Sequence, residues 1–262
     1  DTATTEIYTL SYTTLFRSLE FIGCRHLEDP DLLGIFSKFH HLSQLKILQL
    51  GVIWCKSSNL THIRNNIASL KALENLEIGI TNTEHNYFEG LCEQLATLKT
   101  FRSFGLKTRV LNDQVANKLQ KGIKSLTHII RLSLTFWNCI DLSNAGFSSL
   151  SDSISKLENL RTLILNLFDC KKITDESMEV LVESLGRLAW LNHLEINLDA
   201  FSNLSPVGLA CLEKAVRILP SLEALMIKIS KCYKIAGAHI ENLREVIKNH
   251  SNVRTFKVEH LC

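Results

Sequence analysis

The sequence predicts an α/β solenoid of about nine repeats, with a parallel sheet on the concave face of a horseshoe and helices on its convex face. Two observations carry this prediction. An L-x-x-L-x-L unit, in which other apolar residues sometimes replace leucine, recurs nine times along the 262 residues. Between these units, apolar residues recur at spacings of three and four, which is the spacing of a helical stripe. Strand and helix units this short can bury their apolar faces only by stacking.

The first element of each repeat is predicted to be a short strand. The units begin at Phe16, Leu45, Leu73, Phe101, Ile129, Leu160, Leu191, Leu222 and Val253. In most units another apolar residue follows two places after the last, so apolar and polar residues alternate. Alternation of this kind is typical of a strand with one buried face. The interleaved residues are therefore expected on the concave surface.

The second element is predicted to be a helix, whose apolar stripe is exemplified by Leu119, Ile123 and Leu126. Sequence signals for helix starts agree with this prediction. Asp29-Pro30 and Ser205-Pro206 each place an N-cap residue before a first-turn proline. In Thr174-Asp175-Glu176, a capping residue is followed by acids that the helix macrodipole stabilises. Local chemistry and the repeat period therefore predict the same element.

Repeats of 28 to 31 residues with a strand and a full helix resemble the ribonuclease-inhibitor-like class of leucine-rich repeats, from about Phe16 to Val258. The resemblance implies a horseshoe that recognises another macromolecule. The wider class includes ribonuclease inhibitors, activators of the Ran GTPase, nucleotide-binding immune receptors and ubiquitin-ligase adaptors. The segment Leu163 to Leu188, through Cys170 and Ile173-Thr174-Asp175, is also similar to the cysteine-containing repeats of F-box and related proteins, although the sequence has no F-box segment.

Cysteine and histidine positions favour structural roles. Four cysteines fall seven residues after the second apolar residue of their unit, where such repeats place a residue that hydrogen-bonds the turn backbone: Cys55, Cys139, Cys170 and Cys232. Phe201 occupies the same place in its own repeat, and Cys92 is expected in the core of a helix. For His40-His41 we expect one ring partly buried and one solvated, because adjacent helical residues point in different directions. His193 is expected near Glu195 on the concave face.

Composition and motifs argue against several functions. The net charge is only +2, which gives no reason to expect nucleic acid or an anionic membrane as a partner. The eight cysteines form no C-x-x-C pair, which suggests free thiols in an intracellular, cytoplasmic setting. Nucleotide-binding, zinc-protease and serine-hydrolase motifs are missing from the sequence. We therefore predict a non-catalytic binding module without cofactor, metal, nucleic acid or membrane partner.

The predicted binding surface lies where an apolar centre meets charged neighbours. Trp137, Ile164 and Phe168 are expected to touch one another at the centre of the concave face. The remaining members are Thr135, Asn166, the basic Lys107 and Arg109 on one side, and the acidic Glu195 and Asp199 on the other. Aromatic centres with polar rims are typical of protein interfaces. The alternative is that Trp137 and Phe168 fold under the turns that follow their strands and belong to the core.

Two further functions stay open at this point. The chain is alternatively the recognition domain of a larger signalling or ubiquitin-ligase protein. An enzyme, such as a GTPase activator with its site assembled on the concave face, would need an arginine that reaches a nucleotide, for which Arg109 and Arg131 are the candidates. Such an enzyme predicts several titratable groups with shifted pKa values in one pocket.

Residues 1–18 are expected to be a non-native leader, since DTATTEIYTLSYTTLFRS fits no repeat before Phe16 and resembles a translated sequencing adaptor. Residues 16–262 are expected to form a single repeat domain. After the last predicted strand no capping helix follows, so truncation at the C-terminal end is expected as well.

Overall fold

The computed structural model describes residues 17–22, 34, 36–51, 63–80 and 87–260. Within these residues, nine strands form one sheet in chain order, and every neighbouring pair is parallel. The strands are β1 (Ser18–Ile22), β2 (Ile47–Gly51), β3 (Asn75–Ile80), β4 (Ser103–Thr108), β5 (Arg131–Phe136), β6 (Thr162–Asn166), β7 (His193–Asn197), β8 (Ala224–Lys228) and β9 (Thr255–Glu259). The sequence prediction of one strand per repeat is confirmed.

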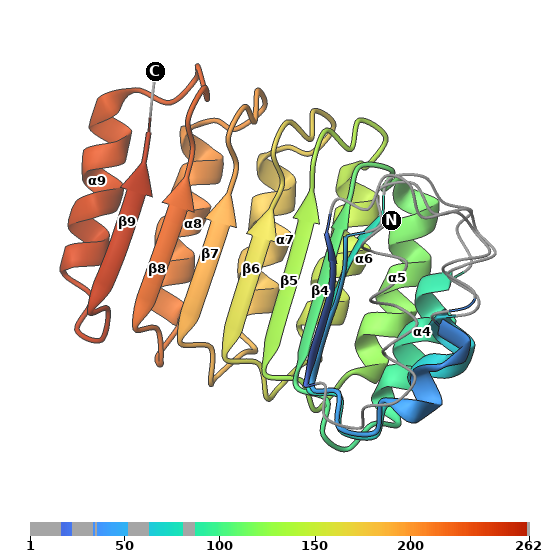
Figure 1. Cartoon of the computed structure of the whole chain (residues 1–262). Helices are drawn as coiled ribbons and strands as arrows, with labels where there is room; N and C mark the ends of the chain where they lie inside the picture. Colours follow the sequence, from blue (N-terminus) through green and yellow to red (C-terminus); the bar gives the residue numbers. More distant parts are fainter. Residues whose placement is uncertain (1–16, 23–33, 35, 52–62, 81–86, 261–262) are drawn as a thin grey trace.

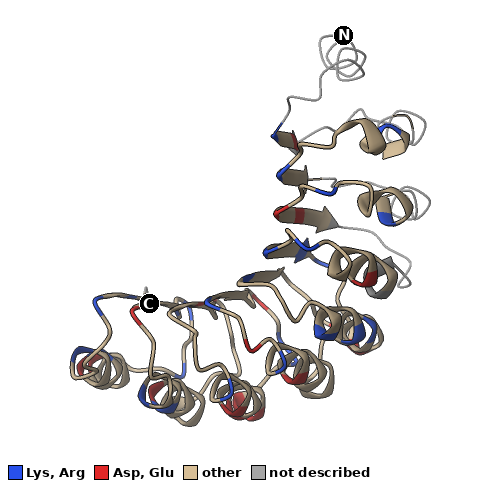
Figure 2. Ribbon diagram, turned by 90° about the horizontal axis from the view of Figure 1, so that it is seen from below, with Lys and Arg blue, Asp and Glu red and all other residues tan. Residues whose placement is uncertain are grey.

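Helices connect successive strands and lie on one side of the sheet (Figure 1). They are the 3₁₀ helix η2 (Phe39–His41), a helical turn over 63–67, α4 (Tyr87–Ala96), α5 (Asp113–Ser125), α6 (Asn144–Ile154), α7 (Asp175–Leu185), α8 (Pro206–Ile218) and α9 (Gly237–Lys248). Seen along the stack, the strands line the inner side of a curve and the helices line its outer side (Figure 2). The predicted α/β solenoid of the leucine-rich-repeat type is therefore confirmed.

The core is a continuous layer between the sheet and the helices. Strand register places equivalent residues side by side, so that Leu132 pairs with Phe104 on one side and Leu163 on the other. All three are fully buried. Burial of a large aliphatic side chain contributes roughly 1.5 to 3 kcal/mol. Because much of that burial comes from the next repeat, each repeat depends on its neighbours for stability.

A tight turn closes each strand in the later repeats. Asn138, Asp169, Ala200 and Lys231 stand at equivalent positions, and all have positive φ between 53° and 60°. This left-handed conformation reverses the chain sharply, although none of the four is glycine. The turn brings the next residue back into the core.

In three of these four turns the residue after the positive-φ position is a cysteine that the sequence analysis predicted there. The Sγ of Cys139 lies 3.7 Å from the carbonyl of Thr108, that of Cys170 3.7 Å from Phe136 O, and that of Cys232 3.2 Å from Leu198 O. All three residues are buried, as are Phe201 in the equivalent place and Cys92 in α4. Burial raises the pKa of the Cys92 thiol. The structural assignment of these cysteines is confirmed, while Cys55 lies outside the described residues.

The helix starts agree with prediction at one position and differ at another. Ser205 caps α8, because its Oγ accepts a hydrogen bond from the backbone N–H of Val207 at 3.1 Å. Thr174 occupies the N-cap position of α7 but makes no side-chain capping bond. Its Oγ1 instead accepts a hydrogen bond from Asn144 Nδ2 in the previous repeat, at 2.9 Å. The predicted start at Asp29-Pro30 lies outside the described residues.

The prediction for the adjacent histidines was wrong in one respect. His40 and His41 are both exposed, because η2 presents both to solvent. Their ring centroids lie 3.9 Å apart. His193 is half-buried at the start of β7, in the same strand as Glu195 and on the same face by alternation, as expected.

Candidate functional site

The strand order arranges the predicted binding residues as the sequence suggested. Lys107 lies in β4, and Arg109 follows that strand. Trp137 follows β5, Phe168 follows β6, and Asp199 follows β7. Basic residues therefore lie on one side of the aromatic pair and an acidic residue on the other. We call the nine predicted residues the concave patch.

The two aromatic residues do not belong to the core. The Phe168 side chain is 37% exposed and Trp137 is half-buried. They occupy equivalent turns in neighbouring repeats, and the N–H of Asn138 donates to the carbonyl of Phe168 at 2.8 Å. The guanidinium of Arg109 lies 5.9 Å from the Trp137 ring centroid, within the range of a cation–π interaction. The alternative that both rings are core residues is therefore wrong.

Two other members of the patch lie differently from the prediction. Ile164 pairs with Ser133 and Glu195, four residues before Phe168 in the chain. Ile164 therefore lies inside β6, whereas Phe168 lies in the turn after the strand ends at Asn166. Thr135 is only 6% exposed, because its short side chain lies between Lys107 and Asn166 in register. It contributes little surface to the patch.

Several polar members already have partners within the chain. Lys107 forms an ion pair with Glu77 of the neighbouring strand. Asn166 Oδ1 accepts a hydrogen bond from the N–H of Phe168 at 3.1 Å, which holds the turn that carries this ring. Asp199 Oδ1 accepts one from the N–H of Ser230 at 2.6 Å. These bonds hold the backbone and the neighbouring strands in place around Trp137 and Phe168.

The described residues hold no group of three or more His, Cys, Asp or Glu side chains arranged to bind a metal. On the concave face, Lys257 and Lys228 lower the pKa of Glu259, the carboxylate at the end of β9. That shift comes from exposed ion pairs at the end of the sheet rather than from a pocket. It gives no support to the enzyme alternative.

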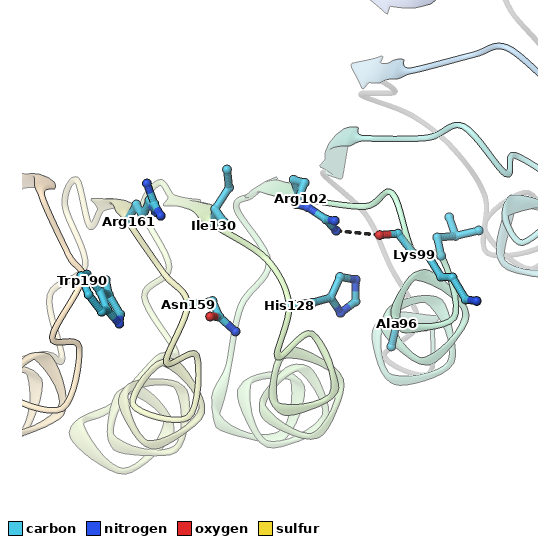
Figure 3. Close-up of a pocket in the computed structure, with 9 residues that line it drawn as sticks. Ala96, Lys99, Arg102, His128, Ile130, Asn159, Arg161 and Trp190 are labelled. Carbon is cyan, nitrogen blue, oxygen red and sulfur yellow. Dashed lines mark hydrogen bonds between the residues drawn. The ribbon is translucent and has the colours of Figure 1, made fainter.

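A groove that the sequence analysis missed lies at the opposite edge, where helices end and strands begin. Its volume is about 720 Å³, and it is lined by Ala96, Leu98, Lys99, Arg102, His128, Ile130, Asn159, Arg161 and Trp190. Figure 3 shows these side chains projecting from successive turns of one edge. A second hollow of about 470 Å³ shares Arg161 and Trp190 and extends as far as Arg254. We call the first of these the edge groove.

Strand alternation gave no indication of the edge groove, because its residues lie at the ends of helices and in the turns that precede the strands. The available signal was a change of residue type at one repeated position. Thr100, Asn159, Ser221 and Asn252 hold this position in their repeats, whereas Trp190 holds it in the repeat of β7. The Trp190 side chain is 64% exposed.

No protein-family model matches the chain, and no curated protein matches it. Among solved structures, it is similar to a chain of the Rad7 and Elc1 complex from yeast, with 18% identity and a TM-score of 0.45, covering 96% of this chain and 72% of that one. It is also similar to the tropomodulin C-terminal domain of Caenorhabditis elegans, with 13% identity and a TM-score of 0.44, covering 59% of this chain and 90% of that one. The fold assignment rests on the strand and helix order described above.

Among the described helices, none combines the length and the apolar character needed to cross a bilayer.

Proposed function

We propose that the chain is a protein-binding module of the ribonuclease-inhibitor-like class and that a protein partner docks on the concave patch. The observation that carries this proposal is the exposed Phe168 ring beside the half-buried Trp137, in equivalent turns of neighbouring repeats. Neither ring belongs to the buried core cluster. Interfaces draw much of their affinity from such residues.

Charge around the aromatic pair supports a partner with a defined orientation. Arg109 is exposed on the side of β4 and is held near the Trp137 ring. Glu195 and Asp199 are half-buried on the side of β7. Opposite charges on two sides of an apolar centre favour one orientation of a complementary partner and raise its association rate.

We also propose that residues 16–262 form one recognition domain, as would suit a subunit or segment of a larger signalling or ubiquitin-ligase protein. The similarity of Leu163 to Leu188 to cysteine-containing repeats supports this reading, since Cys170 and Ile173 are both fully buried as structural residues of that segment. The proposed role requires no cofactor and no metal.

Site-directed photo-crosslinking tests the location of the partner. A photoreactive amino acid replaces Phe168, and in a control chain it replaces Glu183, which is exposed on the convex helix α7. We expect one protein to be crosslinked through position 168 and not through position 183. Equal crosslinking of the same protein from both positions would contradict the proposed site.

The affinity of the crosslinked partner provides the quantitative test. Trp137→Ala removes an aromatic anchor and is expected to weaken binding by about 2 kcal/mol, roughly thirtyfold. Glu183→Ala is the matched control and is expected to change affinity little. The dissociation constant is measured by calorimetry, and circular dichroism confirms that both variants are folded. An unchanged dissociation constant for Trp137→Ala would rule out the concave patch as the centre of the interface.

A further inference from the structure

The edge groove is built on a regular ladder of backbone hydrogen bonds. The residue before each strand donates its N–H to the carbonyl of the equivalent residue one repeat earlier, as in Ile130 to Arg102 at 2.8 Å and Arg161 to Ile130 at 2.9 Å. The ladder therefore presents its side chains in a row, with about 4.8 Å between neighbouring repeats. From Arg102 to Arg161 the row covers two steps, or roughly 10 Å.

The groove carries positive charge without matching carboxylates. Lys99, Arg102 and Arg161 line it, and no Asp or Glu does. The residue Arg161 is exposed, and its guanidinium has no hydrogen bond or ion pair with another described residue. Arg102 donates through Nη1 to the carbonyls of Lys99 and Phe101, at 2.7 and 2.8 Å, which fixes its guanidinium at the groove. Figure 3 shows the first of these bonds. A fixed guanidinium and one without a partner are well suited to carboxylates.

Trp190 departs from the structural role of its position. In four other repeats the equivalent side chain donates to a turn carbonyl of the preceding repeat: Thr100 to Lys71 O at 3.0 Å, Asn159 to Thr127 O at 3.0 Å, Ser221 to Ala189 O at 2.8 Å and Asn252 to Pro220 O at 2.6 Å. Trp190 makes no hydrogen bond of this kind within the described part of the chain, and its indole is mostly exposed. This repeat therefore lacks the hydrogen bond to the preceding turn and has an exposed apolar side chain in its place.

Ile130 adds a second exposed apolar side chain, 40% exposed, in the row between the two arginines. Exposed apolar groups gathered in a concave, charged setting are typical of a binding site rather than of ordinary surface. Neither Trp190 nor Ile130 belongs to the concave patch. The edge groove is thus a separate surface from the one proposed above.

We propose that the edge groove binds an acidic, extended peptide segment of a protein partner, with carboxylates paired to Arg102 and Arg161 and apolar side chains packed separately on Ile130 and on Trp190. About three residues of extended chain cover the roughly 10 Å between the two arginines. Acidic side chains separated by one or two residues therefore match the spacing of the cations, and an intervening side chain meets Ile130.

The distribution of charge favours a short peptide over a nucleic acid. Beyond Arg161 the row continues with Asn192 and Glu223, and Glu223 lies 3.9 Å from Arg254 in an ion pair. The basic stretch therefore ends within a few residues' length. A nucleic acid gains most of its affinity from many successive phosphate contacts, which this row does not offer.

Selection from a phage-displayed library of short random peptides on the whole chain tests the proposal. We expect a consensus with two or more acidic residues beside an apolar one. Trp190→Ala and Arg161→Glu are each expected to weaken the selected peptide at least tenfold, and added salt is expected to weaken it further. Matched controls are Tyr233→Ala, which removes an aromatic side chain that is 84% exposed, and Arg217→Glu on the exposed face of α8. Both controls are expected to leave the affinity unchanged.

Trp137→Ala separates this proposal from the concave patch, because it is expected to leave peptide affinity unchanged. A selection without an acidic consensus, or peptides whose affinity ignores both Trp190→Ala and Arg161→Glu, would overturn the proposal. A single-stranded oligothymidylate that binds more tightly than the selected peptide and is lost in Arg161→Glu would overturn it in favour of a nucleic acid. Two variants at different positions keep the test valid if one of them fails to fold.

Discussion

At the edge where strands end and helices begin, Asp113 and Asp175 each tie one repeat to the next by two hydrogen bonds. At the edge where helices end and strands begin, Asn159, Ser221 and Asn252 each tie one repeat to the previous one by a single bond. The carboxylate of Asp113 accepts hydrogen bonds from both the N–H and the hydroxyl of Ser143, at 2.8 and 2.6 Å. Asp175 accepts the same pair of bonds from Ser205. At the opposite edge, Asn159 provides one bond to one carbonyl.

The difference shows at which edge a residue of the repeat can be replaced without a large loss of stability. A carboxylate that lies at a helix N-terminus and accepts two hydrogen bonds from the next repeat stabilises both the helix and the contact between the two repeats. Replacement there disturbs two repeats. A single bond from an exposed side chain is worth about 1 kcal/mol or less, so a repeat can lose it and stay folded. Trp190 replaces such a bond, which explains how a binding residue could arise at that edge.

The largest expected effect is at Gly208, beside the Asp175 carboxylate. A Cβ added there would collide with Asp175 Oδ1 and lie 2.8 Å from Leu204 Cδ1. The collision displaces the carboxylate from Ser205, so Gly208→Ala is expected to lower the free energy of unfolding by about 2 to 3 kcal/mol. Urea denaturation followed by circular dichroism measures the change.

Gly237→Ala is the matched control for that substitution. Gly237 begins α9, and an added Cβ there would meet nothing within 4 Å. Alanine is the better helix former, so this change is expected to leave stability unchanged or to raise it slightly. If the two variants lost equal stability, the carboxylate contact would not be the cause.

A smaller effect of opposite sign is expected at Trp190. Trp190→Asn installs the residue type of Asn159 and restores a donor to the turn carbonyl of the preceding repeat. We expect the free energy of unfolding to rise by about 0.5 to 1 kcal/mol, while affinity for the acidic peptide falls. Asn159→Ala, which removes the equivalent bond, is expected to lower stability by a similar amount. A loss of stability in Trp190→Asn would show that the indole supports the fold and would weaken the case for a binding role.

The repeat period predicted the strands, their parallel order and the cysteine position, because each follows from which side chains must be buried. Leu132, Leu163 and Leu194 could be assigned from spacing alone, and all lie in the core. The tie from Asp175 to Ser205 left a signal that was overlooked, since Asp113 and Ser143 repeat the same spacing of 30 residues.

Other features were beyond the reach of spacing. Alternation assigns a side chain to a face but does not say what lies beside it, so the burial of Thr135 between two neighbours was not predicted. The edge groove depends on where turns from four successive repeats meet, which periodicity does not describe. Strand order predicted which repeats carry the residues of the concave patch, while their partners within the chain required the structure.

The smallest effect is expected at His128, which holds the same repeated position as Trp190 and Asn159. Burial lowers the pKa of its ring, the positive charge of Arg102 lowers it further, and a hydrogen bond to the carbonyl of Leu98 opposes both. Because the pKa of this ring is lower in the folded chain, folding favours its neutral form. Its contribution to stability is therefore complete above pH 6.5, the ordinary value, and declines as the pH falls through the lowered pKa.

His128→Asn sharpens the comparison because asparagine, the residue at the equivalent position 159, does not titrate and still offers a side-chain N–H donor. We expect the difference in the free energy of unfolding between pH 7.5 and pH 5.5 to be smaller in this variant than in the original chain, with little change at pH 7.5. Urea denaturation at both pH values gives the two differences. If the two chains lost the same stability between pH 7.5 and pH 5.5, protonation of His128 would not contribute to acid sensitivity. His128 would then stabilise this edge as Asn159 does, through a hydrogen bond alone.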